Sequence, residues 1–402
     1  MKKVYIIGIG MNGAETLTQQ AKQIIGEADC LIGANRMLEP FSALNKTGFT
    51  SWNSGDISDY IQRSEYDTFA VLMSGDCGFF SGSEGLLRAL PESVDSEVVC
   101  GISTPVYFCS KLKIPWQDIP TVNLHGVSSN IARNAARYHR CFFLLGGKLG
   151  AREVCRRLCD YGMGGINVYI GECLGYPHER ILTGKAETFI NTGFDNLSVL
   201  MTDNTEPELF SRSGIPDGEF IRGEVPMTKS EVRALVISKL GIAPADVVWD
   251  IGCGTGSVSV EMALQCYNGR VYSVDKKPEA VALTRQNAVK FRCDNIESSQ
   301  GTAPECLDEL PAPDKVFIGG TCGNLNSIIK LIYDKNHNAV VVLTAVSLET
   351  LNEAMKTLTE CKYEYDILQL SATRTKMVGS HTMLNAENPV FIIKGAKKCV
   401  ES

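Results

Sequence analysis

The feature that most constrains this chain of 402 residues is the segment DIGCGTG at positions 250–256. An apolar stretch, DVVWD, leads into it, and a helix-forming stretch, SVSVEMALQ, follows it. Glycines at alternate positions let the backbone turn sharply and lie directly against a ligand. A buried strand, a glycine-rich turn and a helix in this order are typical of a doubly wound α/β sheet. We therefore expect the second half of the chain to be an α/β domain that binds a ligand at this loop.

The spacing of the glycines predicts the kind of ligand. The pyrophosphate of a dinucleotide favours G-x-G-x-x-G, whose third glycine would stand where this chain has Ser257. The next predicted strand ends in Asp275, whose carboxylate can accept hydrogen bonds from both hydroxyls of a ribose. An acid before the loop, the spacing G-x-G-x-G and Asp275 together favour a nucleoside ligand without a phosphate, namely S-adenosylmethionine (SAM).

Strand and helix patterns alternate through the rest of the second half. The predicted strands lie at 246–250, 270–274, 314–318, 339–343, 364–371 and 389–394. Helical patterns separate the earlier strands, whereas only a loop joins the last two, so these can form a hairpin with one antiparallel strand. The first helix is expected to begin with a capping box, in which Thr228 accepts from the N–H of Glu231 and the Glu231 side chain reaches back. Its predicted apolar face consists of Val232, Leu235, Val236 and Leu240.

The first half of the chain also alternates between strand and helix patterns. Its predicted strands lie at 4–9, 69–73, 97–102, 141–145, 167–171 and 197–201. The N-terminal apolar run is short, contains glycine and leads into a loop and a helix pattern, so it predicts a first buried strand and not a signal peptide. Residues 204–225 are rich in proline, glycine and charge without periodicity. We therefore predict domains at 1–203 and 226–402, joined by a linker at 204–225.

The composition argues against several classes of protein. Lys and Arg total 39 against 46 Asp and Glu, a net charge of −7, which argues against nucleic acid or an anionic membrane as the main partner. No apolar run reaches the length of a membrane span. The 15 cysteines include no C-x-x-C pair, and the nearest two are Cys155 and Cys159. We therefore expect no bound metal, and mostly buried thiols in a reducing cytoplasm.

Longer stretches of the second half carry a resemblance to a known family. Residues 225–264, then GTAPECL, PDKVFIGGTCGNL and NPVFII, resemble the decarboxylating C15-methyltransferases of cobalamin biosynthesis. The resemblance spans residues 225–394 and implies a class I, Rossmann-like methyltransferase with an antiparallel last strand. The residues that it implies as contacts of the methyl donor are Thr228, Gly252, Gly254, Thr255, Gly256, Asp275 and Ala303. An alternative role for Thr228 is to cap its helix, and the two roles are compatible.

The first half carries a different set of motifs. GIGMNG at 8–13 matches G-x-G-x-x-G, but Asp29 precedes the apolar pair Leu31 and Ile32, where a strand would begin, so no acid closes the second strand. Four further motifs fit no dinucleotide-binding pattern; they lie at 74–82, 101–105, 123–126 and 171–181. Together the motifs resemble the tetrapyrrole methylase family, and the last one most resembles its C5-methyltransferases of the cobalamin pathway.

This second resemblance covers nearly all of residues 1–202 and implies a two-lobed, class III methyltransferase. The residues that it implies at the donor site are Ile9, Asp76, Phe79, Ser103 and Thr104. The family usually has proline in the first two glycine loops, where this chain has Met11-Asn12 and Cys77. These substitutions remove the fixed φ angle of proline, but they remove no reactive group. An alternative role for Asp76 is an Asx turn, and His125 is either a proton carrier or a hydrogen-bonded loop residue.

The two resemblances together imply a bifunctional enzyme with one SAM per domain and no protein-bound metal. Its substrate would be precorrin-6B or cobalt-precorrin-6B, methylated at C15 with loss of CO2 by the C-terminal domain and at C5 by the N-terminal domain. Because such a tetrapyrrole carries many carboxylates, the candidate substrate contacts are the basic residues Lys229, Arg233, Arg374 and Lys376. We further expect a cytoplasmic homo-oligomer. Two alternatives stay open: a nucleic-acid or small-molecule methyltransferase with an unrelated N-terminal domain, and a non-catalytic corrinoid-binding protein.

Overall fold

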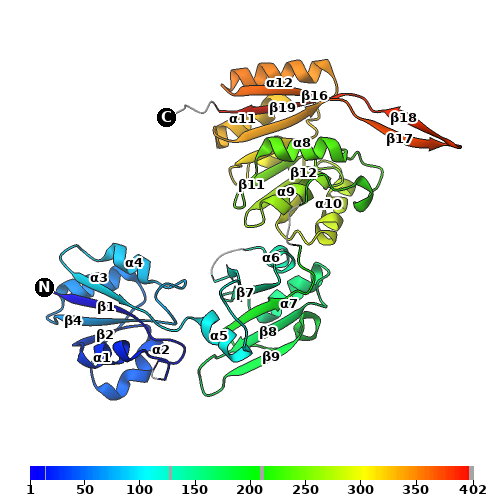
Figure 1. Ribbon diagram of the computed structural model, residues 1–402. Coiled ribbons are helices and arrows are strands. Elements are labelled where there is room, and N and C mark those ends of the chain that lie inside the picture. Colours follow the sequence, from blue (N-terminus) through cyan, green and yellow to red (C-terminus); the bar gives the residue numbers. More distant parts are fainter. Residues whose placement is uncertain (14, 126–128, 209–211, 398–402) are drawn as a thin grey trace. The chain divides into compact units, whose positions relative to one another are not determined.

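The computed structural model describes residues 1–13, 15–125, 129–208 and 212–397 (Figure 1). Its contacts divide the chain into two compact units. Unit 1 comprises Met1–Val127, Arg140–Glu153 and Asn167–Asp203, and unit 2 comprises Ser128–His139, Val154–Ile166 and Asn204–Ser402. Parts of three predictions lie outside the described residues: Gly126 of the motif at 123–126, residues 209–211 of the linker, and residues 398–402 of the C-terminal domain.

The first sheet of unit 1 has five parallel strands in the order β3-β2-β4-β1-β5. The strands are β1 (Lys3–Gly8), β2 (Cys30–Gly33), β3 (Thr47–Thr50), β4 (Thr68–Met73) and β5 (Asp95–Val99). The helices between them are α1 (Gln19–Glu27), α2 (Asn35–Leu38), η1 (Glu39–Leu44), α3 (Ser54–Arg63) and α4 (Ser83–Ala89). Val4 and Ile6 of β1 join one apolar cluster and Ile7 joins another. Because both faces of a parallel sheet are covered, β1 is a continuous apolar run, and the predicted first buried strand is confirmed.

The second sheet of unit 1 is mixed, in the order β6-β7-β10-β8-β9. The strands are β6 (Thr121–Asn123), β7 (Arg140–Leu144), β8 (Asn167–Glu172), β9 (Arg180–Lys185) and β10 (Ser198–Asp203), and η2 (Ala186–Phe189) follows β9. β6 runs parallel to β7, and the other pairs are antiparallel. Helix α5 (Thr104–Leu112) contributes Phe108, whose ring lies edge-on to Phe142 with 6.3 Å between centroids. Each of the two sheets of unit 1 has its own core.

Unit 2 contains a seven-stranded sheet in the order β13-β12-β11-β14-β15-β19-β16. The strands are β11 (Val247–Ile251), β12 (Arg270–Asp275), β13 (Ile296–Gln300), β14 (Lys315–Ile318), β15 (Val340–Ala345), β16 (Glu364–Leu370) and β19 (Val390–Ala396). β19 is antiparallel to both of its neighbours, and the strands from β13 to β15 pair in parallel. The predicted doubly wound sheet with one antiparallel strand is confirmed.

Helices cover both faces of this sheet. They are α8 (Ser230–Leu240), α9 (Ser257–Gln265), α10 (Pro278–Lys290), α11 (Leu325–Lys335) and α12 (Leu348–Glu360), with the short turns η3 (Asp217–Glu219) and η4 (Glu305–Leu307). Alternate residues of β11 supply the two cores: Val248 packs with the predicted apolar face of α8, and Trp249 packs with α11. Burial on both faces explains why β11, β12, β14 and β15 were recognisable as apolar runs.

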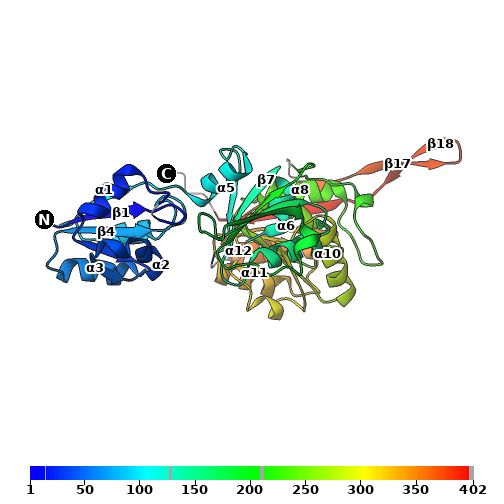
Figure 2. The ribbon, with the colours of Figure 1, turned by 90° about the horizontal axis from the view of Figure 1, so that it is seen from below.

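The connection between β16 and β19 differs from the sequence prediction. It is not a loop but a two-stranded antiparallel ribbon, β17 (Thr373–Val378) and β18 (His381–Ala386), which extends away from the sheet of unit 2 (Figures 1 and 2). The exposed apolar side chains of the ribbon are Met377, Val378, Met383 and Leu384. Apart from the half-buried Arg374, the residues of the ribbon are exposed on both faces, so it shows no alternation of apolar and polar residues from which it could have been predicted.

The predicted capping box at the start of α8 is wrong. Lys229 is the N-cap residue, and no side chain caps the helix. The carboxylate of Glu231 instead pairs with Arg374, whose Nε lies 3.2 Å from Oε1 of Glu231. An ion pair with a residue from β17 replaces the local hydrogen bond that the sequence favoured, because a charged partner binds the carboxylate more strongly than a neutral N–H.

The segment before α8 packs onto unit 2. Ile215 and Phe220 are buried in the core beside α8. The carboxylate of Glu261 accepts hydrogen bonds from the N–H of Gly214, at 2.8 Å, and of Ile215, at 3.0 Å. The described residues from 212 onward are thus held against unit 2, and the domain boundaries at 203 and 225 stay a prediction.

Helix α6 (Ile131–Arg137) belongs to unit 2, although the chain forms it between β6 and β7. Its N-terminus is held by the buried carboxylate of Asp294, which accepts hydrogen bonds from the N–H groups of Ile131 (2.7 Å), Ala132 (3.0 Å) and Arg133 (3.0 Å). A carboxylate is favourable at this position because it satisfies unpaired N–H groups and opposes the helix dipole. Helix α7 (Ala151–Asp160) follows β7.

The cysteines behave as small apolar residues. All those described are free thiols, and most are buried, as predicted. Among the described residues no group of three or more His, Cys, Asp or Glu side chains could hold a metal ion. The described part of the chain also forms no helix with the length and apolarity needed to span a membrane.

Candidate functional sites

Unit 2 has a pocket of about 230 Å³ at the carboxyl ends of four neighbouring parallel strands. Most of the residues that line it end or follow β11, β12, β13 and β14, and they include Gly252, Gly254, Asp275, Ala303 and Gly320. Ligands of doubly wound proteins bind at this edge of the sheet, where the loops after the strands converge. Four of the seven donor contacts implied for unit 2 therefore line one pocket.

The glycines of the loop at 250–256 are required by the backbone. Gly252, Gly254 and Gly256 have φ angles of +79°, +55° and +75°, a region that residues with a Cβ rarely adopt. A Cβ on Gly252 would lie 2.7 Å from the N of Gly320, and one on Gly254 would lie 2.6 Å from the carbonyl O of Pro226. At these positions the loop approaches neighbouring backbone too closely for a residue with a side chain. Gly252 and Gly254 therefore present only backbone atoms to the pocket.

Asp275 lies at the end of β12, on the wall of the pocket. Its Oδ2 accepts a hydrogen bond from the N–H of Gly254, and its Oδ1 accepts one from the N–H of Lys277, both at 3.0 Å. These bonds orient the carboxylate and tie it to the glycine loop. Each oxygen keeps a further lone pair that can accept from a ligand hydroxyl.

Asp250 is the first residue of the same loop and has no exposed surface. Burial, opposed by a hydrogen bond from the hydroxyl of Ser259 and assisted by the nearby charge of Asp275, raises the pKa of this carboxyl group to about 7. Its Oδ1 has no hydrogen-bond partner among the described residues. Asp250 is therefore a buried acid at the start of the loop, whereas Asp275 lines the pocket.

The other three implied donor contacts do not line this pocket. Thr255 is buried, and its hydroxyl has no partner among the described residues. Gly256 is the N-cap residue of α9. Thr228 is half-buried, and its carbonyl oxygen accepts a hydrogen bond from the guanidinium of Arg233.

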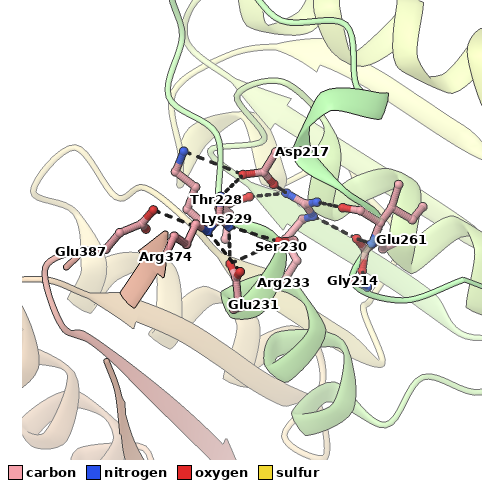
Figure 3. A network of polar contacts seen from close by, with 11 residues as sticks. Gly214, Asp217, Thr228, Lys229, Ser230, Glu231, Arg233, Glu261, Arg374 and Glu387 are labelled. Carbon is pink, nitrogen blue, oxygen red and sulfur yellow. Dashed lines mark hydrogen bonds and ion pairs between the residues drawn. The ribbon is translucent and has the colours of Figure 1, made fainter. Parts of the chain in front are cut away.

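A network of charges surrounds the start of α8 (Figure 3). The guanidinium of Arg233 lies between two carboxylates, with 2.9 Å from Nε to Oε1 of Glu261 and 2.9 Å from NH1 to Oδ1 of Asp217. Arg233 and Glu261 have no exposed side-chain surface. The guanidinium of Arg233 is therefore buried and ion-paired with residues that hold 214–217 onto unit 2, and its predicted contact with substrate has no support from this geometry.

Two of the other predicted substrate contacts belong to the same network. Arg374 pairs with Glu231 and lies 3.6 Å from Asp217 and 3.8 Å from Glu387. Lys229 lies 3.8 Å from Asp217. Lys376 is exposed on β17. The four basic residues thus form no common substrate surface.

Unit 1 has a larger cavity, of about 970 Å³. Small-molecule pockets span roughly 300–1,000 Å³, so this cavity lies at the upper end of that range. Two of the five implied donor residues, Phe79 and Thr104, line it. Ile9 is buried in the core beside β1, and Ser103 is the N-cap residue of α5 without a side-chain hydrogen bond.

Asp76 holds together the two loops that follow β4 and β5 in unit 1. Its Oδ2 accepts a hydrogen bond from the N–H of Gly78, which is an Asx turn, and its Oδ1 accepts from the N–H of Gly101, both at 2.8 Å. The neighbouring thiol of Cys77 is buried and donates to the carbonyl O of Ile6, and burial raises its pKa to about 12. Both side chains therefore brace the two loops that end β4 and β5.

Three basic residues of this cavity, Arg36, Lys148 and Arg152, were not predicted as site residues, whereas Tyr176 belongs to the motif at 171–181. Lys148 stands in the segment GGKLG at 146–150, a glycine-rich signal that could have been recognised as a binding loop. Arg36 lies in α2, the short helix after β2, and no distinctive sequence pattern marks it. His125 also lines the cavity, and its backbone N–H donates to the side chain of Asn123 at 2.9 Å.

Comparison with known proteins identifies both halves of the chain. Residues 219–397 match the family model of the precorrin methyltransferase domain, and residues 3–190 match that of the tetrapyrrole (corrin/porphyrin) methylases. A probable cobalt-precorrin-6B C(15)-methyltransferase (decarboxylating) of Pyrobaculum calidifontis is 44% identical over 187 residues, which are 46% of this chain and 96% of that relative. The chain belongs to the precorrin methyltransferase family. Its N-terminal half is a tetrapyrrole methylase domain, so the alternative with an unrelated N-terminal domain is wrong.

Other precorrin methyltransferases show the same extent of similarity. A relative of the same name from Sulfolobus acidocaldarius is 40% identical over 189 residues, which are 46% of this chain and 98% of the relative. The chain is also similar to a solved structure of precorrin-6Y C5,15-methyltransferase from Geobacter metallireducens, with 38% identity, 46% of this chain and 97% of that chain covered, and a TM-score of 0.44.

Proposed function

We propose that this chain is a bifunctional SAM-dependent C-methyltransferase that acts on precorrin-6B or cobalt-precorrin-6B. Unit 2 methylates C15 and removes CO2 from the neighbouring acetate, and unit 1 methylates C5. The observation that carries the proposal is the pocket of unit 2, where Asp275 and the glycine loop meet at the carboxyl edge of the sheet in a chain of this family.

The residues present fit SAM in unit 2. The glycine loop offers a close backbone surface without side chains, and Asp275 offers two oxygens that accept from ribose hydroxyls. Ala303 lies on the same pocket wall, where a small side chain leaves room for an adenine. In unit 1, Phe79 and Thr104 lie on the cavity wall, and Asp76 orders the loops beside it.

Bound at these sites, SAM supplies a methyl group from its sulfonium, and the tetrapyrrole supplies the nucleophilic carbon. The work of the chain is therefore to position the two molecules, which can contribute roughly 7–11 kcal/mol to lowering a barrier. Asp275 and the loop at 250–256 hold and orient the donor, and the pocket walls exclude water. For the decarboxylation, the conjugated ring nitrogens of the substrate provide the electron sink.

We also propose a homo-oligomer in the cytoplasm. The support for an oligomer is the ribbon β17–β18, whose four exposed apolar side chains are unusual on a surface that faces only water. The support for the compartment is the set of free thiols, which a reducing environment preserves. Analytical ultracentrifugation of the wild type and of Leu384→Ser tests the oligomer, and we expect the variant to sediment as a smaller species.

The variant Asp275→Ala tests the assignment of unit 2. Removing both carboxylate acceptors should reduce CO2 release and C15 methylation about a hundredfold, as expected for two charge-assisted hydrogen bonds. Asp334→Ala, which removes an exposed carboxylate from α11, is the matched control and should leave both rates unchanged. The assay follows CO2 and the mass of the product after incubation with labelled donor and with the metal-free or the cobalt substrate.

Calorimetry separates the two donor sites. The wild type should bind two SAM per chain and Asp275→Ala only one. Persistent CO2 release by Asp275→Ala would show that the donor of unit 2 is bound elsewhere. Donor binding to neither unit would instead favour the non-catalytic corrinoid-binding alternative.

A further inference from the structure

The cavity of unit 1 is lined by three cationic side chains that form no ion pair with any residue the structure describes. Arg36, Lys148 and Arg152 all lie on its wall, and all are exposed. Among the described residues, these three side chains form a single polar contact, a long hydrogen bond of 3.5 Å from NH1 of Arg36 to the hydroxyl of Tyr176, which also lines the cavity. Within the described residues, none of the three cations forms an ion pair.

The other arginines of unit 1 behave differently. Each of them forms an ion pair with a carboxylate; they are Arg63, Arg88, Arg140 and Arg180. The partners include Asp203 and Glu172, which lie in the strands of the second sheet. The two arginines of unit 1 that lack such a partner among the described residues are thus the two that line the cavity. In a chain with a net charge of −7, this distribution indicates that the cavity wall is kept positive.

The carboxylates on the same wall do not cancel this charge. Glu153 and Asp195 line the cavity, against three cationic side chains. Asp195 is engaged locally, because its Oδ1 accepts a hydrogen bond from the N–H of Leu197 at 2.8 Å. The positive side chains therefore exceed the negative ones, and an anionic ligand would be attracted.

Neutral polar groups add to the cavity wall. Ser198 is buried there, and its hydroxyl has no partner among the described residues. The ring of His125 lies against the backbone of Gly146, where a Cβ would come within 2.0 Å of its Nδ1. Glycine at position 146 thus makes room for the ring at the cavity wall. A buried hydroxyl without a partner is unfavourable, so its presence beside the cavity also suits a polar ligand.

We infer that the cavity of unit 1 binds a polycarboxylate, and that Arg36, Arg152 and Lys148 select it by pairing with its carboxylates. The planar guanidinium groups can each bind one carboxylate through two parallel hydrogen bonds, and Lys148 contributes a point charge. The inference rests on the proposed function, since the polycarboxylate is the tetrapyrrole substrate of that site. The basic residues predicted as substrate contacts in unit 2 are less available for this role, because Arg233 and Arg374 already form ion pairs with carboxylates.

The test uses the full-length chain and an octacarboxylate porphyrin as a fluorescent probe, alongside C5 methylation of the substrate. Arg36→Gln and Arg152→Gln should each weaken probe binding about tenfold, and the double variant more, because each removes a charge-assisted bidentate pair. Lys148→Gln should have a smaller effect. Arg88→Gln, which removes an exposed arginine paired with Glu84 outside the cavity, is the matched control and should bind the probe as the wild type does.

Three further measurements separate recognition of carboxylates from loss of structure. In the variants the KM for the tetrapyrrole should rise by a similar factor with kcat nearly unchanged, while SAM binding and CO2 release from unit 2 stay at the wild-type level. Arg152→Lys should recover part of the affinity, because the charge returns without the fork. Raised salt should weaken binding of the probe to the wild type more than to the double variant.

The outcomes distinguish the inference from the proposed function. Unchanged probe affinity and unchanged KM in the double variant would overturn the inference, even with both methylations intact. If the wild type methylates C15 but never C5, the proposed function of unit 1 is wrong, and the probe titration still decides whether the cavity selects polycarboxylates. A lowered thermal midpoint would show that a variant fails to fold. In that case Arg36→Lys and Arg152→Lys are used instead, and they must also weaken probe binding and raise the KM relative to the wild type.

Discussion

Asp250 offers the sharpest test of the energetics of the glycine loop, because its carboxyl group is fully buried. The preceding residue, Trp249, is also fully buried and can report on unfolding near Asp250. Burial raises its pKa from 3.8 to about 7. The folded protein therefore keeps the proton at pH values where the unfolded chain has lost it. The stability that this proton provides is fully present below pH 3.8 and is lost as the pH rises through about 7.

The magnitude follows from the size of the shift. A difference of about 3 pKa units corresponds to about 4 kcal/mol in the free energy of unfolding, since each unit is worth about 1.4 kcal/mol. Roughly 2–3 kcal/mol of this falls between pH 5 and pH 8. Asp250→Asn has nearly the same shape and does not ionise. We therefore expect the variant to gain stability relative to the wild type, by about that amount, as the pH is raised over this interval.

The assay is urea-induced unfolding at several pH values from 5 to 8, followed by the emission of tryptophan. Trp249 is completely buried, whereas Trp52 and Trp116 are 84% and 52% exposed, so the change in emission reports mainly on unit 2. Ser259→Ala removes a hydrogen bond that lowers the pKa of Asp250, and should move the transition to higher pH. Parallel stability curves for the wild type and Asp250→Asn would refute the reasoning, because they would show that the carboxyl group does not change its protonation on unfolding.

Further variants test the contacts that hold unit 2 together. Arg233→Met leaves the buried charge of Glu261 without its partner and should lower the free energy of unfolding by about 3–5 kcal/mol, measured in urea; adding Glu261→Gln should recover part of the loss. Asp294→Ala leaves three N–H groups of α6 unsatisfied and should lower the unfolding free energy by about 1–3 kcal/mol in the same assay, and no change would contradict its role as a cap. Gly254→Ala should abolish SAM binding to unit 2 in calorimetry, because its Cβ would meet the carbonyl of Pro226.

The sequence could predict the features that depend on residues close together in the chain. The buried parallel strands are continuous apolar runs, and the glycine loop and α9 follow β11 directly, so 257–265 was predicted as a helix with the bounds that the structure gives. Asp275 was placed at the end of its strand because strand ends are marked by local turns. The short outer strands β3, β6 and β9 were missed, since each has a neighbour on one side only and little of it is buried.

Only the tertiary structure decided which charges are available. Arg233, Arg374, Arg36 and Arg152 look alike in the sequence. The first two form ion pairs with carboxylates, whereas the last two line a cavity and form no ion pair with any described residue. The predicted capping box does not form, because Glu231 instead pairs with Arg374, which lies 143 residues further along the chain. A local pattern determines backbone conformation and the ends of strands, because these depend on neighbouring residues. The partner of a charged side chain depends on which distant segments the fold brings beside it, and the sequence alone does not specify that.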